Sequence, residues 1–159
     1  MIFQVPFACK IDGFWVLLRI DSGSADVAFK FYETPLGSPN ALATHTIVAE
    51  TFGAVGDFNV AYSILASELT LTKNTDYCLA VRNATAAQSG LFLHTLGHAD
   101  HRQFYMGGTN LRGATRDNDS GAFSEDTTAM RIMGVRVSQV DDGTGAGGAS
   151  KGKLTGLLG

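Results

Sequence analysis

The sequence has few charged residues, few cysteines and no long apolar run. Charged side chains make up 17% of its 159 residues and the net charge is −3, so we expect no broad basic surface for nucleic acid. Apolar runs reach only five residues, as at 14–18, which is too short to span a bilayer. Two cysteines cannot form a disulfide framework. Nucleic acid and membrane are therefore not expected as partners.

Signals for secretion and catalysis are also missing. Lys10 and Asp12 interrupt the first apolar stretch, so we expect no signal peptide. The sequence contains no nucleophile elbow, no His-Glu-x-x-His motif and no phosphate-binding glycine loop before a helix. Loop carboxylates are plentiful, but turns and solubility explain each pair. We expect a protein that is not an enzyme and that needs no cofactor.

Apolar residues alternate with other residues along much of the chain. In the first run they occupy odd positions: Phe3, Val5, Phe7, Cys9 and Ile11. After Gly13 they move to even positions, as a turn or a bulge at the glycine produces: Phe14, Val16, Leu18 and Ile20. Alternation recurs over residues 27–31, 60–64, 69–71, 77–81 and 133–137. These runs predict half-buried antiparallel strands, in which the alternating apolar positions form the buried side.

Many short strands with almost no helical signal predict an all-β fold, an antiparallel β-sandwich with a jelly-roll-like organisation. Residues 60–68, VAYSILASE, are the best helical candidate, yet they fit a strand equally well. Cys9 lies on the apolar side of its strand, whereas Cys78 is out of step with its apolar neighbours Tyr77 and Leu79. The two thiols are expected on different faces, which argues against a bridge but leaves one conceivable.

Two stretches escape the alternation, residues 107–128 and residues 143–159. The first is expected to be ordered by contacts with the sandwich or a neighbour, with Phe123 as an anchor. The second is a glycine-rich arm that follows the sandwich domain of residues 1–142. The arm has seven glycines in 17 residues and carries +2 against −5 for the rest of the chain. We expect it to dock on an adjacent subunit through Leu154, Leu157, Leu158, Lys151 and Lys153.

Residues 93–104, LHTLGHADHRQF, place three histidines close together in the sequence. On a helix, His94, His98 and His101 would share one face, as ligands do in many zinc sites. Gly97 breaks such a helix, and the residues before it have the pattern of a strand. Polar loop residues are therefore favoured over a metal site.

The segment DNDSG at residues 117–121 has the Asp-x-Asp-x-Gly order that opens many calcium loops. The EF-hand spacing fails, because the glycine is fifth instead of sixth and Thr128 stands where a bidentate Glu is needed. A looser calcium site remains an alternative to solvated turn residues, with the ligands Asp117, Asp119, Glu125 and Asp126. Turn residues are favoured, and no metal is expected to be needed for folding.

Four aromatic residues fall outside the strand alternation: Trp15, Tyr32, Phe92 and Tyr105. Aromatic faces stack on sugars, so these residues are candidates for a carbohydrate platform that binds surface glycans. Subunit interfaces are also enriched in Tyr, Trp and Phe, and we favour contacts of that kind or coverage by loops.

Three segments resemble a β-sandwich domain found in structural proteins of tailed bacteriophages. They are FQVPFACKIDGFWVLLRIDSGSADVAFKFYE, ELTLTKNTDYCLAVRNAT and YMGGTNLRGATRDNDSGAFSEDTTAMRIMGVRV. In the second segment the resemblance implies a tight turn at Asn74 and a new strand from Tyr77. The third carries a Gly-Gly, Thr-Arg, Gly-Ala-Phe, Asp-Thr-Thr, Met-Gly order that ends in the final strand. The resemblance spans most of residues 3–147, although the domain usually ends a longer protein.

The resemblance implies a non-enzymatic structural component of a bacteriophage virion, on the outer surface of the particle. Capsid decoration, fibre and collar protein are all compatible with it. The expected partners are copies of the chain itself and other virion proteins, contacted through the sandwich and the arm. Two alternatives stay open: a carbohydrate-binding β-sandwich module and a self-assembling extracellular filament subunit.

Overall fold

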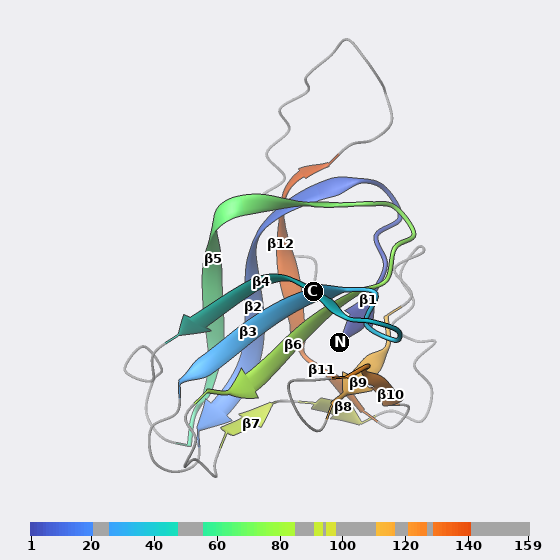
Figure 1. Cartoon of the computed structure of the whole chain (residues 1–159). Helices are drawn as coiled ribbons and strands as arrows, with labels where there is room; N and C mark the ends of the chain where they lie inside the picture. Colours follow the sequence, from blue (N-terminus) through green and yellow to red (C-terminus); the bar gives the residue numbers. More distant parts are fainter. Residues whose placement is uncertain are drawn as a thin grey trace.

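A computed structural model describes residues 1–20, 26–47, 56–84, 91–93, 95–97, 111–116, 121–126 and 129–140. Within these ranges the regular elements are β-strands and no helix occurs (Figure 1). The strand pairs are antiparallel, so the predicted all-β antiparallel fold is confirmed. The glycine-rich arm, with Leu154, Leu157, Leu158, Lys151 and Lys153, lies outside the described residues.

Two four-stranded sheets form the body of the protein. The first sheet has the order β1 (Ile2–Phe3), β6 (Tyr77–Asn83), β3 (Val27–Glu33) and β4 (Asn40–Ile47). The second sheet has the order β12 (Met133–Val140), β2 (Cys9–Ile20) and β5 (Phe58–Leu71), and β7 (Leu91–Leu93) pairs with the end of β2. Two short pairs accompany them, β9 (Gly113–Thr115) with β10 (Ser124–Asp126) and β8 (Thr95–Gly97) with β11 (Ala129–Arg131).

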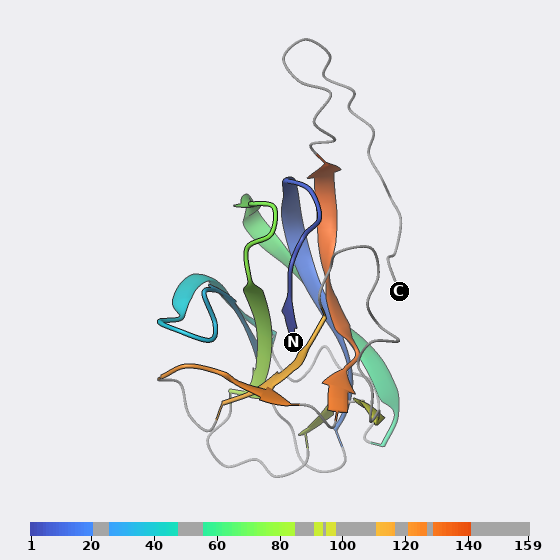
Figure 2. The same ribbon diagram turned by 90° about the vertical axis from the view of Figure 1, so that its right-hand side faces the viewer.

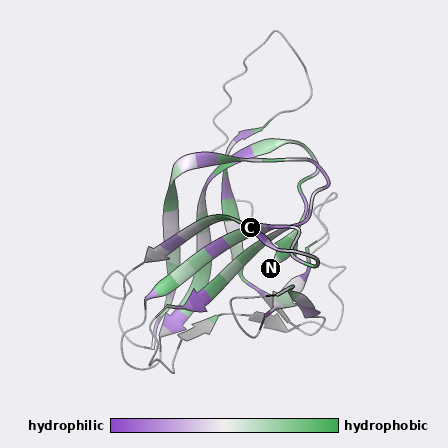
Figure 3. Ribbon diagram, in the orientation of Figure 1, coloured by the Kyte–Doolittle hydropathy of each residue, from purple (hydrophilic) through white to green (hydrophobic). Residues whose placement is uncertain are grey.

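The two sheets lie against each other as layers, and the chain passes repeatedly from one to the other. Figure 2 shows β6 in one layer and β2 with β12 in the other. Hydrophobic and hydrophilic bands alternate along the strands in Figure 3, which follows from the two-residue repeat of a half-buried strand.

Aromatic rings fill the space between the sheets. Phe14 of the second sheet stacks on two rings of the first, with centroid distances of 6.2 Å to Phe29 and 5.3 Å to Phe31. Phe31 also stacks on Tyr77 at 5.6 Å. All four side chains belong to one buried apolar cluster with residues of both sheets. Their packing joins the layers, since neighbouring rings add specific contacts to the burial of apolar area.

Gly13 produces the predicted change of parity through a bulge. β2 continues through this residue, and its pairing with β5 shifts register between Ile11 and Gly13. The shift lets Ile11 and Phe14 both point inward, and both are fully buried. A Cβ atom on Gly13 would lie 2.7 Å from the carbonyl oxygen of Ser63, so the close approach of β5 requires glycine. The other ambiguous segment, residues 60–68, is part of strand β5.

The turn between β5 and β6 has the tight turn at Asn74 and the strand start at Tyr77 that the resemblance implied. Asn74 adopts a left-handed φ of 59°, and β6 begins at Tyr77. The Asn74 N–H donates to the carbonyl oxygen of Val5 at 3.0 Å, and the Tyr77 hydroxyl accepts from the N–H of Thr72 at 2.8 Å. Asparagine tolerates this region of φ better than most residues, which explains its place in the turn.

The two cysteines are free and buried on different sides of the first sheet. Cys9 belongs to the cluster between the sheets, whereas Cys78 packs in a second cluster with Ile2, Tyr32 and Phe123. Burial raises the pKa of both thiols, which disfavours the reactive thiolate. The expectation of separate faces is confirmed.

We expect Phe31→Ala to lower the free energy of unfolding by about 3–5 kcal/mol, because it removes the ring that contacts both Phe14 and Tyr77. Phe7→Ala is the matched control, since Phe7 is 41% exposed, and it should change stability by less than about 1 kcal/mol. Urea denaturation followed by circular dichroism measures both. Equal losses in the two variants would show that the stacked rings do not carry the core.

Candidate functional site

Strand β5 exposes a row of large apolar side chains at the edge of the second sheet. Ala61 and Ser63 point inward and are buried, while the alternate residues are between 42% and 63% exposed: Phe58, Val60, Tyr62 and Ile64. We call these four residues the β5 stripe. In the part of the chain that the structure describes, six large hydrophobic residues are exposed, and four of them form this stripe. Such a concentration on one strand face is typical of an interaction site.

The stripe continues onto β2. Leu17 is paired with Val60 and Trp15 with Tyr62, and both β2 residues are partly exposed on the same face. Side chains directly opposite each other in an antiparallel pair stand about 5 Å apart, so Trp15 and Tyr62 are neighbours. The β5 stripe, Trp15 and Leu17 together form what we call the outer face of the second sheet.

Gly134 determines how Trp15 lies on this face. The two residues are paired between β12 and β2. A Cβ atom on Gly134 would lie 2.8 Å from Nε1 and 2.9 Å from Cε2 of the indole. The indole therefore packs directly against the backbone of Gly134, where any side chain would block it. This contact explains why Trp15 is only partly exposed although it points outward.

Cationic groups flank the aromatic rings of the outer face. The Arg136 guanidinium donates to Asp12 from Nη2 at 2.6 Å and lies 5.6 Å from the ring centroid of Tyr62. Arg19 lies 5.2 Å from the ring centroid of Phe58. The hydrogen bond to Asp12 raises the pKa of Arg136, and the guanidinium and the carboxylate are opposite charges in direct contact. The outer face thus combines apolar area with an ion pair at its margin, in which the charges of Arg136 and Asp12 balance each other.

The position of the β5 stripe corrects one prediction. Alternation over residues 60–64 is present, but Val60, Tyr62 and Ile64 face solvent and not the core. Beside Phe14, whose ring stacks on Phe31, the inward positions of β5 hold the small residues Ala61 and Ser63, and Ser63 is paired with Phe14. Farther along the strand Leu71 points inward and is buried, as the alternation over residues 69–71 predicts. A strand pattern identifies two faces, and the packing partner decides which of them is buried.

The four aromatic candidates have different outcomes. Trp15 lies on the outer face, next to Tyr62, which the sequence pattern had assigned to the core. Tyr32 is 5% exposed and packs edge-on against Phe123 at 5.3 Å, so its ring is covered and cannot serve as a sugar platform. Phe92 belongs to strand β7, for which the structure describes the backbone at this position but not the side chain. Tyr105 lies outside the described residues.

The structure brings no metal site together in the ranges that it describes. No three His, Cys, Asp or Glu side chains gather there in a way that could hold an ion. The other metal candidates lie outside the described residues: His94, His98, His101, Asp117 and Asp119. Glu125 accepts a hydrogen bond from Arg112, and Asp126 lies 3.4 Å from Arg131, so both carboxylates of the looser calcium alternative have arginine partners.

No protein-family model matches the sequence, and no curated protein or solved structure is similar enough to count as a match. Among the described residues there is no helix of the length and hydropathy that crossing a membrane requires. We therefore infer a function from the exposed surfaces of the protein.

We expect Gly134→Ala to displace the indole of Trp15, because the new methyl group would occupy the position of the ring. Trp15 is the sole tryptophan, so the intrinsic emission reports on this site alone. The variant should show red-shifted emission and stronger quenching by acrylamide. Gly37→Ala, where an added Cβ meets nothing within 4 Å, should leave the emission unchanged. An unchanged spectrum for Gly134→Ala would contradict the packing of the indole on β12.

Proposed function

We propose that the protein is a non-enzymatic structural subunit that assembles with copies of itself through the outer face of the second sheet. The observation that carries this proposal is the β5 stripe, four large apolar side chains side by side on an edge strand. Full burial of one such side chain is worth about 1.5–3 kcal/mol. A partner that covers the stripe therefore gains enough to offset part of the entropy lost on association.

A second copy of the chain fits this face better than a charged partner. The central part of the face is apolar, and the Arg136–Asp12 pair beside it is already neutral. Two identical faces related by a two-fold axis bury apolar area against apolar area, as closed homo-oligomers do. Edge strands also invite association, since the backbone groups on the outer side of β5 have no strand partner in the described part of the protein.

The biological setting that we propose comes from the sequence resemblance. In that setting the subunit belongs to the outer surface of a bacteriophage virion, as a capsid decoration, fibre or collar protein. Other virion proteins are its further partners. The arm of residues 143–159 would add a second contact, in which its leucines dock on an adjacent copy while the outer face holds the main interface.

Sedimentation velocity over a range of concentrations tests the proposed assembly. We expect the full chain to associate and Val60→Glu to weaken association at least about tenfold, because it would place a charge in the centre of the buried stripe. Ser67→Glu is the matched control, since Ser67 is exposed on the same strand outside the stripe. Deletion of residues 143–159 should weaken association and leave the sandwich folded, which circular dichroism verifies.

Two outcomes would contradict the assembly proposal. One is a full chain that stays monomeric at the highest soluble concentration. The other is equal association of Val60→Glu and Ser67→Glu, because the stripe would then contribute nothing. Val60 is 63% exposed, so the substitution should be tolerated by the fold, which circular dichroism verifies.

A carbohydrate-binding function is the second candidate, favoured by one specific arrangement. Trp15 and Tyr62 are adjacent on the outer face, and the carboxylate and guanidinium of Asp12 and Arg136 lie beside them. Aromatic rings next to polar groups are what sugar rings require. If the face binds sugar, neutral oligosaccharides such as cellohexaose or chitohexaose will change Trp15 emission in a saturable way. Tyr62→Ala should abolish the change and Phe58→Ala, at the far end of the stripe, should retain it.

A further inference from the structure

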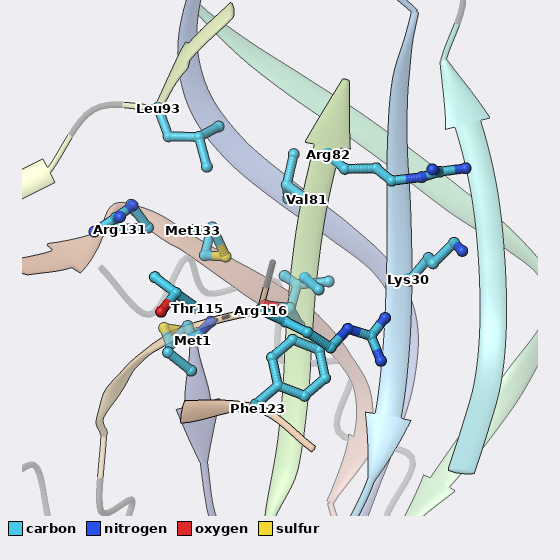
Figure 4. A pocket seen from close by; sticks show the side chains of 13 residues that line it. Met1, Lys30, Val81, Arg82, Leu93, Thr115, Arg116, Phe123, Arg131 and Met133 are labelled. Atoms are coloured by element: carbon cyan, nitrogen blue, oxygen red, sulfur yellow. Dashed lines mark hydrogen bonds between the residues drawn. The ribbon is translucent and has the colours of Figure 1, made fainter. Parts of the chain in front are cut away.

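A cavity of about 530 Å³ lies beside strand β6, away from the outer face of the second sheet (Figure 4). Strands of both sheets contribute to its walls, together with β9, β11 and Phe123, the residue before β10. Apolar side chains form one part of the lining: Leu79, Val81, Leu93 and Met133. The volume falls in the range of about 300–1,000 Å³ that small-molecule sites occupy.

Positive charge is concentrated around this cavity. Among the described residues that line it none is acidic, and four are cationic: Lys30, Arg82, Arg116 and Arg131. The whole chain has only 12 Lys and Arg residues against 15 Asp and Glu, with a net charge of −3. One third of its cationic side chains therefore surround one cavity, although the protein as a whole carries a net negative charge.

Arg116 is held in a fixed orientation at the cavity. Its Nη2 donates to the Tyr32 hydroxyl at 2.8 Å, and its Nη1 donates to the carbonyl oxygen of Gly121 at 3.3 Å. The guanidinium also lies 4.5 Å from the ring centroid of Phe123 and 4.9 Å from that of Tyr32. A guanidinium oriented in this way loses little further entropy when an anion binds.

The other cations approach from two sides. Figure 4 shows Lys30, Arg82 and Arg116 on one side of β6 and Arg131 on the other. Lys30 is paired with Ala80 and Arg82 with Ala28, so small side chains stand opposite the long cationic ones on this face of the first sheet. Arg131 lies 3.4 Å from Asp126, which borders the site without lining it.

The backbone of β6 supplies a further donor. The N–H of Leu79 donates to the carbonyl oxygen of Met1 at 3.0 Å. The backbone N–H and C=O groups of Leu79 therefore point toward the β1 side of β6, away from β3. By the alternation of an antiparallel strand, the N–H of Val81 points to the same edge, into the cavity. In the described part of the chain no strand pairs with β6 at this point.

We propose that this cavity binds a small ligand with two or more oxyanion groups (phosphate, sulfate or carboxylate) attached to a partly apolar body. Guanidinium groups bind phosphate and carboxylate oxygens with paired hydrogen bonds, and the ammonium of Lys30 adds charge. The apolar wall of Val81 and Met133 accommodates the uncharged part of the ligand. The site is separate from the outer face of the second sheet and does not depend on the proposed assembly.

Isothermal titration calorimetry with tripolyphosphate, citrate and a sulfated disaccharide tests the proposal at low ionic strength. We expect saturable binding of at least one probe, and the identity of that probe distinguishes phosphate, carboxylate and sulfate ligands. Lys30→Gln and Arg82→Gln should each weaken binding about tenfold or more, the usual loss for a hydrogen bond to a charged group. Binding should also weaken as salt is raised.

Matched controls separate a site from general surface charge. Lys73→Gln removes the same charge as Lys30→Gln at an exposed position that does not line the cavity, and it should bind like the unmodified protein. Thermal midpoints without ligand verify that every variant is folded, and bound ligand should raise the midpoint of the unmodified protein. Equal weakening by cavity and control variants would overturn the proposal, as would no saturable binding of any probe at millimolar concentration.

Discussion

The stacking of Phe14 on Phe29 and Phe31 is the contact on which the rest of the structure depends. These rings fill the space between the sheets, and the inward positions of β5 directly beside Phe14 and Val16 hold the small residues Ser63 and Ala61. The large apolar residues in this part of β5, at positions 58–64, lie on the outside, whereas Leu71 farther along the strand is buried. One register between β2 and β5 places Phe14 beside Ser63 in the core and Trp15 beside Tyr62 on the outside. The packed core and the exposed stripe therefore follow from the same strand pairing.

The sequence pattern predicted much of this architecture, because a two-residue repeat is a local signal. It located most of the longer strands and the irregularity at Gly13, and it separated Cys9 from Cys78. It gave no run for β4, and β9 and β10 lie in a segment that showed no alternation. It failed at Val60 and Tyr62, because alternation is symmetrical and the choice of inner face depends on a strand that is about 45 residues distant. The covered ring of Tyr32 agrees with the favoured coverage by loops, although the sequence did not indicate that Phe123 would be the residue that covers it.

The cationic cavity had no signal in the sequence at all. Its charged residues lie at positions 30, 82, 116 and 131, and no short motif connects them. Only the pairing of β3 with β6, and the return of the chain through β9 and β11, brings them to one place. The outer face of the second sheet and the cavity therefore differ in the interactions that they offer a partner. The outer face of the second sheet offers apolar area, whereas the cavity offers fixed positive charge beside an apolar wall.

The bulge at Gly13 fixes the length of the chain in this part of the protein. It allows Ile11 and Phe14, three positions apart, to point to the same side of one strand. Loss of a single residue here would turn the first half of β2 over. Lys10 and Asp12 would then enter the interior, and Cys9 and Ile11 would face water. Insertions and deletions are therefore excluded from this strand far more strictly than substitutions are, and related chains should keep the same spacing even where their residues differ.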